Sequence, residues 1–198
     1  MSAPQTFLHS LHIARHLPKE NAMSAPLVRD QVVAPTAGSY RIDPVRSRIA
    51  FTTRHLFGLG AVHGTFELQD GVIRIAEPLE DSSAVATISA ASFSTGNPSR
   101  DRTVRSSRFL DTAAHPRITF TADRLRTTTR YPTLVGRLVV RNRPGTVELQ
   151  IDQVDQSGRE LRALAHTRID RYAFGVTRSP GFAARHLDIR LDVVATRM

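Results

Sequence analysis

Cysteine and tryptophan are both absent from this sequence of 198 residues. Without cysteine the chain has no disulfide framework, no zinc–thiolate site and no thiol nucleophile. No apolar run approaches the roughly 20 residues that a membrane-spanning helix needs, so we do not expect a transmembrane protein. Lysine is also scarce, because Lys19 is the only one and arginine supplies nearly all of the formal charge of +9.

Several functional classes lack their sequence signatures. The chain contains no G-x-S-x-G elbow, P-loop, H-E-x-x-H helix or glycine-rich dinucleotide turn, so we expect no enzyme and no cofactor. No histidine pair has the spacing of metal ligands, which predicts no metal site. The positive charge attracts nucleic acid, acidic lipid or phosphorylated ligands, although an arginine bias also fits GC-rich codon usage. Only 6% of residues are aromatic, and stacking platforms for single-stranded nucleic acid are missing.

The first 38 residues differ from the rest of the chain. The tetrapeptide MSAP occurs at 1–4 and again at 23–26, so translation could start at Met1 or at Met23. The segment between them lacks the uninterrupted apolar core of a secretory signal. We expect residues 1–38 to form a flexible N-terminal extension, residues 39–198 to form the domain, and the protein to be cytoplasmic.

From residue 39 onward, apolar residues alternate with polar ones, as in half-buried strands. In 48–55, Ile49, Phe51, Thr53 and His55 share one face. Asp70-Gly71 between two alternating runs predicts a hairpin turn, and 142–145 and 156–158 have turn composition. The pattern gives eight or nine strands with no helices between them. It predicts an all-β fold, a sandwich or an up-and-down barrel, with a closed eight-stranded meander favoured.

The segment 94–111 is the one predicted helix, near 99–108. Ser99 can cap it, and Asp101 suits the positive end of the helix dipole. Arg102, Arg105 and Arg108 recur every third residue and so share one face, while Val104 and then Phe109-Leu110 can turn inward. We expect this crossover to carry Phe109 across one end of the barrel as a lid.

These segments resemble the YceI-like, lipocalin-like family of polyisoprenoid-binding proteins, from about Tyr40 to Thr196. The likeness rests on the sequences at 40–56, 62–73, 94–120, 134–142 and 169–175. Positions that match the family motifs are Asp43, Ser47, Phe51, His55, Gly64, Phe66, Asn97, Arg100, Asp101, Arg105, Ser106, Phe109, Asp111, Pro116, Phe120, Arg171, Phe174 and Gly175. The resemblance implies an antiparallel eight-stranded barrel whose apolar pore holds one long isoprenoid or acyl chain. We therefore expect a non-enzymatic carrier or sequestering protein for an isoprenoid quinone, a polyprenyl compound or a long acyl chain. The resemblance also leaves open a homodimer and peripheral contact with a membrane.

The predicted site combines inward strand positions with the lid. Its ligand-binding residues are Ile49, Phe51, Thr53, His55, Val62, Phe66, Phe109, Phe120 and Leu138. Small inward residues such as Gly64, Gly136 and the alanines of 84–92 suggest that the core leaves room for a chain. His63 has the opposite parity and should face solvent.

Three alternatives remain open. His55 can be hydrogen-bonded at the barrel wall or can contact a head group. Arg100 and Asp101 are interpreted as a cap and a salt bridge that anchor the lid, rather than as a catalytic pair. The arginine stripe is either a solvated face or a fork for pyrophosphate. The competing function is a basic protein with a filled barrel core that binds nucleic acid or acidic membranes.

Overall fold

The computed structural model describes residues 35–55, 60–127, 131–181 and 183–198. This part of the chain contains nine strands and three short helical segments. The strands are β1 (Gly38–Ile42), β2 (Arg48–His55), β3 (Gly60–Ile75), β4 (Ser83–Ser94), β5 (Arg117–Arg126), β6 (Thr133–Val140), β7 (Arg143–Ser157), β8 (Glu160–Asp170) and β9 (His186–Arg197). The helical segments are η1 (Leu79–Asp81), α1 (Pro98–Arg105) and η2 (Arg171–Phe174).

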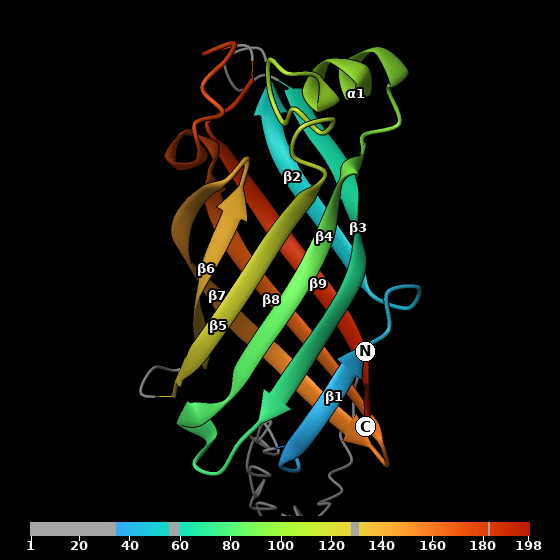
Figure 1. Ribbon diagram of the computed structural model, residues 1–198, viewed down its shortest axis with the longest axis vertical. Coiled ribbons are helices and arrows are strands. Elements are labelled where there is room, and N and C mark those ends of the chain that lie inside the picture. Colours follow the sequence, from blue (N-terminus) through green and yellow to red (C-terminus); the bar gives the residue numbers. More distant parts are fainter. Residues whose placement is uncertain (1–34, 56–59, 128–130, 182) are drawn as a thin grey trace, which may run out of the picture. The chain divides into compact units, whose positions relative to one another are not determined.

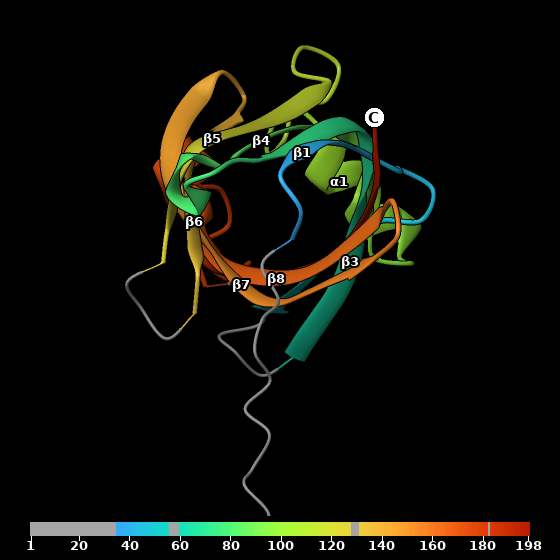
Figure 2. The ribbon, with the colours of Figure 1, turned by 90° about the horizontal axis from the view of Figure 1, so that it is seen from below.

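The strands close into an eight-stranded antiparallel barrel, as predicted (Figures 1 and 2). From β2 to β9, each strand pairs with the next one along the chain, and β9 pairs back with β2. Strand β1 also pairs with β3 and β9, so β1 and β2 occupy one position in the ring, one after the other. Among the described strands, closure leaves no long unpaired edge that could recruit another chain.

Two polar side chains hold the break between β1 and β2. The Asp43 carboxylate accepts hydrogen bonds from the backbone N–H groups of Val45 (2.9 Å) and Arg46 (3.1 Å). The Ser47 hydroxyl accepts from the backbone N–H of Val194 (3.0 Å) and donates to its carbonyl oxygen (3.3 Å). These family-matching positions therefore turn the chain and fasten it to β9.

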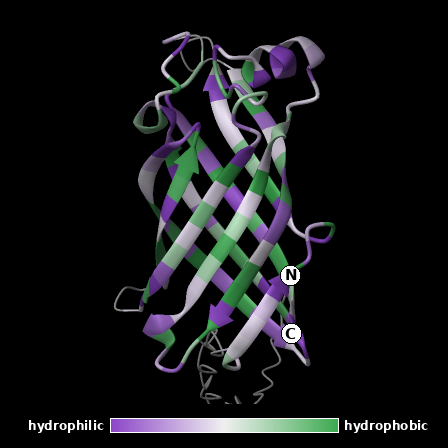
Figure 3. Cartoon of the chain, in the orientation of Figure 1, coloured by the Kyte–Doolittle hydropathy of each residue, from purple (hydrophilic) through white to green (hydrophobic). Residues whose placement is uncertain are grey.

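Hydrophobic and hydrophilic residues alternate along many of the strands, as the green and purple bands of Figure 3 show. In β9, Leu187, Ile189, Leu191 and Val193 line the interior, whereas Asp188 and Arg190 are exposed. His63 is exposed, as its parity predicts, and its Nδ1 lies 3.1 Å from the Thr52 hydroxyl. A period of two thus assigns most side chains to the correct face.

The predicted hairpin at Asp70-Gly71 is wrong, because β3 runs unbroken through both residues. The pairing of β3 with β4 shifts between Leu68 and Asp70, which is the mark of a β-bulge. A Cβ on Gly71 would lie 2.6 Å from Cδ1 of Ile42 and 2.9 Å from the carbonyl oxygen of Val85. Glycine is present here because neighbouring strands approach closely, and not because the chain turns.

The second predicted turn is displaced by two residues. The chain reverses at Arg141-Asn142, where both residues have positive φ angles of 51° and 59°, as in a two-residue hairpin turn. Gly145 lies inside β7, and a Cβ there would come within 2.8 Å of the Phe174 ring. Asn142 thus takes the left-handed conformation, but the predicted range 142–145 extends into a strand.

The predicted N-terminal extension lies almost wholly outside the described residues, so it stays a prediction. The first strand begins at Gly38, and every described residue belongs to one unit, residues 32–198. Within the described residues, no helix is long and apolar enough to cross a membrane.

Candidate functional site

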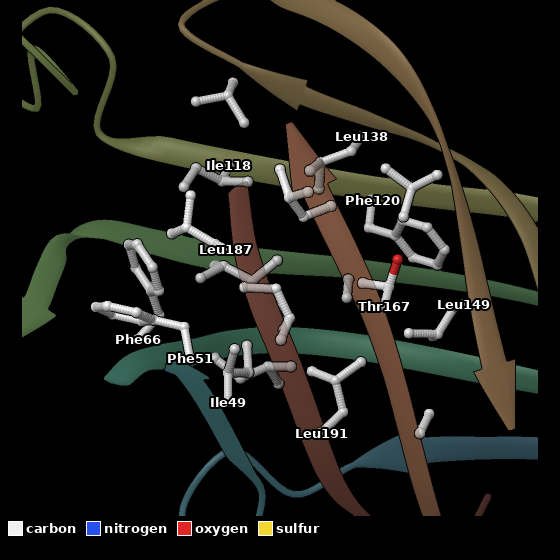
Figure 4. Close-up of a pocket in the computed structure, with 18 of the residues that line it drawn as sticks. Ile49, Phe51, Phe66, Ile118, Phe120, Leu138, Leu149, Thr167, Leu187 and Leu191 are labelled. Carbon is white, nitrogen blue, oxygen red and sulfur yellow. The ribbon is translucent and has the colours of Figure 1, made fainter. Parts of the chain in front are cut away.

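A cavity of about 980 Å³ runs through the barrel and is lined from every strand of the ring. This volume is at the upper end of the roughly 300–1,000 Å³ typical of ligand pockets. The close-up in Figure 4 shows aliphatic and aromatic side chains from different strands facing a shared space, with Thr167 supplying a hydroxyl among them. No aspartate, glutamate or histidine belongs to the described lining, whose charged members are Arg54, Arg100 and Arg171.

Eight of the nine residues predicted to bind a ligand line this cavity. They are Ile49, Phe51, Thr53, Val62, Phe66, Phe109, Phe120 and Leu138. The Thr53 hydroxyl donates to the carbonyl oxygen of His186 (2.8 Å), so it already has an acceptor. The side chain of His55 lies outside the described part, and both interpretations of it stay open. The structure places the eight on the wall, and their contact with a ligand stays a prediction.

Three phenylalanines form a cluster on one side of the cavity. Phe51 lies 5.7 Å from Phe66 and 5.2 Å from Phe93 between ring centroids, and Phe66 lies 5.4 Å from Phe93. These separations are typical of favourable aromatic pairs. Phe93 is a lining residue that the sequence analysis missed. The alternation around Phe93 did not predict its inward position, because the pairing of β3 with β4 shifts at two bulges and the inward parity changes along β4.

The expectation that Gly64 and Gly136 open space for a ligand is wrong. A Cβ on Gly64 would collide with the Phe51 ring and with the carbonyl oxygen of Ser94. A Cβ on Gly136 would lie 2.5 Å from the Phe120 ring and 2.9 Å from the Cβ of Ala122. Both glycines accommodate an aromatic ring across the strand pair. Ala84 and Ala86, in contrast, do line the cavity as small residues.

The crossover between β4 and β5 forms one end of the cavity, as predicted for a lid. Val104, Phe109 and Leu110 all line it, and Phe109 is buried. The helix is shorter than predicted and its cap is Asn97, because the Asn97 side chain accepts a hydrogen bond from the backbone N–H of Arg100 (3.1 Å). Ser99 lies inside the first turn, after Pro98, which suits the first helical position.

Asp101 anchors the lid through Thr95, and not through the predicted salt bridge to Arg100. The carboxylate accepts from the backbone N–H (3.0 Å) and the hydroxyl (2.6 Å) of Thr95. The same hydroxyl accepts from Nε of Arg100 (2.8 Å). Asp101 is 6% exposed, so these hydrogen bonds are shielded from water. The two residues act together, with a threonine between them.

The arginine stripe divides into two kinds of side chain. Arg102 and Arg108 are exposed, as predicted. Arg105 is half-buried, and its Nε and Nη2 donate to the carbonyl oxygen of Phe93 at 3.1 and 2.5 Å. The prediction of a single solvated face is therefore wrong for Arg105, which ties the helix to the end of β4. None of the three lines the cavity.

Arg171 is a buried arginine that holds the loop 171–185 in place. Its guanidinium donates to the carbonyl oxygens of Val176, Arg178 (2.9 Å), Ala183 (2.8 Å) and Ala184 (2.8 Å). Burial lowers the pKa of Arg171 from its ordinary value, and carbonyl dipoles take the place of a counter-ion. Arg171 matches a family motif in the sequence, but the sequence did not predict this role.

Further lining residues come from β7, β8 and β9, and the sequence analysis did not include them in the site. They include Leu149, Ile151, Val154, Leu161, Thr167, Ile169, Leu187 and Leu191. The alternation of apolar and polar residues along β9 is the signal that could have identified Leu187 and Leu191. No group of three metal-ligating side chains occurs within the described ranges.

Comparisons with known proteins agree with this geometry. A family model described as a YceI-like domain matches residues 40–195. Protein YceI of Escherichia coli O157:H7 is 30% identical over 166 residues, covering 79% of this chain and 86% of that protein. The corresponding protein of Salmonella arizonae is 27% identical over 165 residues, with the same shares covered.

Solved structures share the fold at lower identity. BcnA of Burkholderia cenocepacia superposes with a TM-score of 0.68 at 21% identity, over 78% of this chain and 99% of that one. A polyisoprenoid binding domain of Saccharophagus degradans superposes with a TM-score of 0.62 at 14% identity, over 82% of this chain and 100% of that one. The YceI protein of Campylobacter jejuni superposes with a TM-score of 0.60 at 20% identity, over 71% of this chain and 87% of that one.

Proposed function

Since the chain belongs to the YceI-like family, we propose that its barrel binds one long-chain amphipathic lipid, an isoprenoid or an isoprenoid quinone, for carriage, storage or sequestration. The observation that carries the proposal is the cavity of about 980 Å³ with an almost wholly apolar wall. Each buried methylene contributes roughly 0.8 kcal/mol to binding, so a long chain needs little polar help. The name of the Saccharophagus domain supports the same ligand class.

The charged and amide side chains of the lining lie at one end of the cavity, which we take as the end for the ligand's head group. Near α1 the lining includes Asn97, Ser99, Arg100 and Thr103, and Arg171 lies at the same end of the barrel. The opposite end contributes hydroxyls from Ser82, Ser83 and Thr127. Because the charged lining is positive throughout, neutral or acidic head groups suit it and cationic ones do not. The quinone is thus one member of the class that fits.

The competing proposal, a basic protein with a filled core, conflicts with the open cavity. A non-enzymatic role is part of our proposal, since no carboxylate or histidine of the described lining can serve as an acid or base. A barrel with eight strands is wide enough to hold one small ligand, as lipocalins do.

Lipid extraction and mass spectrometry of protein from its native host test the proposal directly. We expect a stoichiometric isoprenoid or other long-chain lipid. Binding of a polyprenyl alcohol is then compared between Ala86→Phe, which fills the cavity from β4, and Val85→Phe, its exposed neighbour on the same strand. Ala86→Phe should weaken binding while Val85→Phe leaves it unchanged. Absence of lipid, together with equal binding by both variants, would refute a cavity ligand.

A further inference from the structure

One end of the barrel has a large excess of arginine. We call it the α1 end, and define it by the described connections 95–116, 141–142, 171–181 and 183–185, which lie together in the upper part of Figure 1. These connections contain the arginines 100, 102, 105, 108, 141, 171, 178 and 185. Their acidic residues are Asp101 and Asp111, and Asp101 is buried. The exposed charge of this end is therefore strongly positive.

Several of these arginines have no acidic partner. In the part of the chain that the structure describes, no ion pair involves Arg102, Arg108, Arg141 or Arg178. Arg102, Arg108 and Arg178 are exposed. Ion pairs are found elsewhere, as between Arg162 of β8 and Asp192 of β9, and at the α1 end Arg185 is paired with Asp170. The charge at the α1 end is thus available to an outside partner.

The opposite end of the barrel has a different charge. Its described connections are 76–82, 127, 131–132 and 158–159, and they contain Glu77, Glu80 and Asp81 with one arginine, Arg159. The barrel therefore has a charge asymmetry along its axis. A negatively charged surface attracts the α1 end more strongly than the other end, which orients the molecule before contact.

We propose that the α1 end docks on the surface of an anionic lipid bilayer. The positive face coincides with the polar end of the cavity and with the lid residues Val104, Phe109 and Leu110. Docking in this orientation brings the lid to the surface in which long-chain lipids reside. Each arginine near an anionic bilayer strengthens binding, and the gain disappears within a Debye length.

Two observations favour a bilayer over nucleic acid. The cavity suits a ligand of the class that membranes contain. The described α1 end has no exposed aromatic side chain on which a base could stack, because Phe109 and Phe174 are buried. Tyr172 is half-buried, and the guanidinium carbons of Arg171 and Arg185 lie 4.8 and 5.3 Å from its ring centroid. Large exposed apolar residues are also missing from this described end, since Val45, Val85, Tyr131 and Met198 lie elsewhere. Docking is therefore electrostatic and does not depend on insertion.

Vesicle co-sedimentation of the full chain tests the proposal. Vesicles of phosphatidylcholine alone are compared with vesicles containing one third phosphatidylglycerol. The test variant is Arg102→Glu/Arg108→Glu, and the control is Arg74→Glu/Arg124→Glu, two exposed arginines nearer the opposite end with the same change in net charge. Thermal unfolding of both variants, and of Arg102→Gln/Arg108→Gln, verifies that each is folded.

We expect binding to the anionic vesicles only, lost at high salt and reduced about tenfold or more by the test variant. The control should retain most of the affinity. Equal losses in both variants would overturn the docking face, and so would binding to neutral vesicles. Tighter binding to a short DNA duplex than to anionic vesicles would assign the face to nucleic acid instead. Cavity binding, measured with polyprenyl alcohol in the absence of vesicles, is a separate readout and should be unchanged.

Discussion

At two places in the cavity wall, a phenylalanine ring occupies the space that a glycine leaves on the next strand. A Cβ added to Gly136 would meet only side-chain atoms, namely the Phe120 ring and the Cβ of Ala122. Gly136→Ala should destabilise the barrel by about 1–3 kcal/mol through overpacking. Urea unfolding of the single variant measures this cost.

A double-mutant cycle with Phe120→Leu shows whether the ring is the cause. In the Phe120→Leu background, Gly136→Ala should cost less, because the smaller side chain leaves room for the new methyl group. Equal costs in both backgrounds would place the strain in the backbone.

Phe109 is the lid residue whose loss should affect both stability and ligand retention. Phe109→Ala removes a buried ring (8% exposed) that borders the cavity. We expect a loss of about 3 kcal/mol in the free energy of unfolding, at the lower end of the usual range because one face of the ring already borders open space. Dissociation of a bound polyprenyl alcohol should become faster. An unchanged dissociation rate in a folded variant would mean that the ligand leaves elsewhere.

At the scale of elements, the lid depends more on Asp101 than on its arginines. Asp101→Ala leaves the backbone N–H and the hydroxyl of Thr95 without their charged acceptor, which should cost about 2 kcal/mol. Hydrogen exchange of the amides in 95–105 should accelerate, since the helix keeps only the Arg105 link to the end of β4. If exchange speeds up equally throughout the barrel, the anchor is not local.

The exposed arginines of α1 provide the matched comparison. Arg102→Gln/Arg108→Gln should change the free energy of unfolding by less than about 0.5 kcal/mol, because exposed charges contribute little. Since neither side chain lines the cavity, the affinities for a polyprenyl pyrophosphate and for the matching alcohol should both persist in detergent-free solution. A loss of about tenfold for the pyrophosphate alone, equivalent to about 1.4 kcal/mol, would make the helix an anion site.

The sequence predicted elements better than their ends. Alternation predicted the strands and many of their inward residues, because a strand with one solvated face must repeat every two residues. It left a sandwich and a barrel open, and favoured the barrel. Asp70-Gly71 predicted a turn that does not exist, since close approach between strands requires glycine as strongly as a turn does. Asparagine and serine are both favourable N-cap residues, so the residue types of Asn97 and Ser99 do not distinguish them. Only the backbone conformation decides which side chain accepts a hydrogen bond from an N–H group of the first turn. The Thr95–Asp101 link could not be predicted, because it depends on how β4 meets the helix.

At the scale of the whole barrel, stability should fall in acid. Hydrogen bonds from Arg185 and Arg162 hold the pKa values of Asp170 and Asp192 below their ordinary range. A carboxyl whose pKa is lowered on folding stabilises the protein above its unfolded pKa, and this contribution disappears as pH falls through the folded value. The melting temperature should therefore stay nearly constant around neutral pH and decrease below about pH 4.

Asp170→Asn isolates one of these contributions. The variant should be less stable than the parent at neutral pH, and its melting temperature should vary less between neutral and acidic pH. Parallel pH curves for the two proteins would mean that other carboxyls dominate the acid response.

The pairing of β9 with β1 and β2 also determines when the barrel can form during synthesis. Ser47 and Val194, which hydrogen-bond across this seam, are 147 positions apart. On the ribosome, β1 to β8 can pair only as an open, curled sheet until β9 has emerged. The apolar inner face stays accessible to chaperones and to other nascent chains throughout that interval. Contacts of such long range also fold slowly, so any lipid can enter its cavity only after translation of β9 is complete.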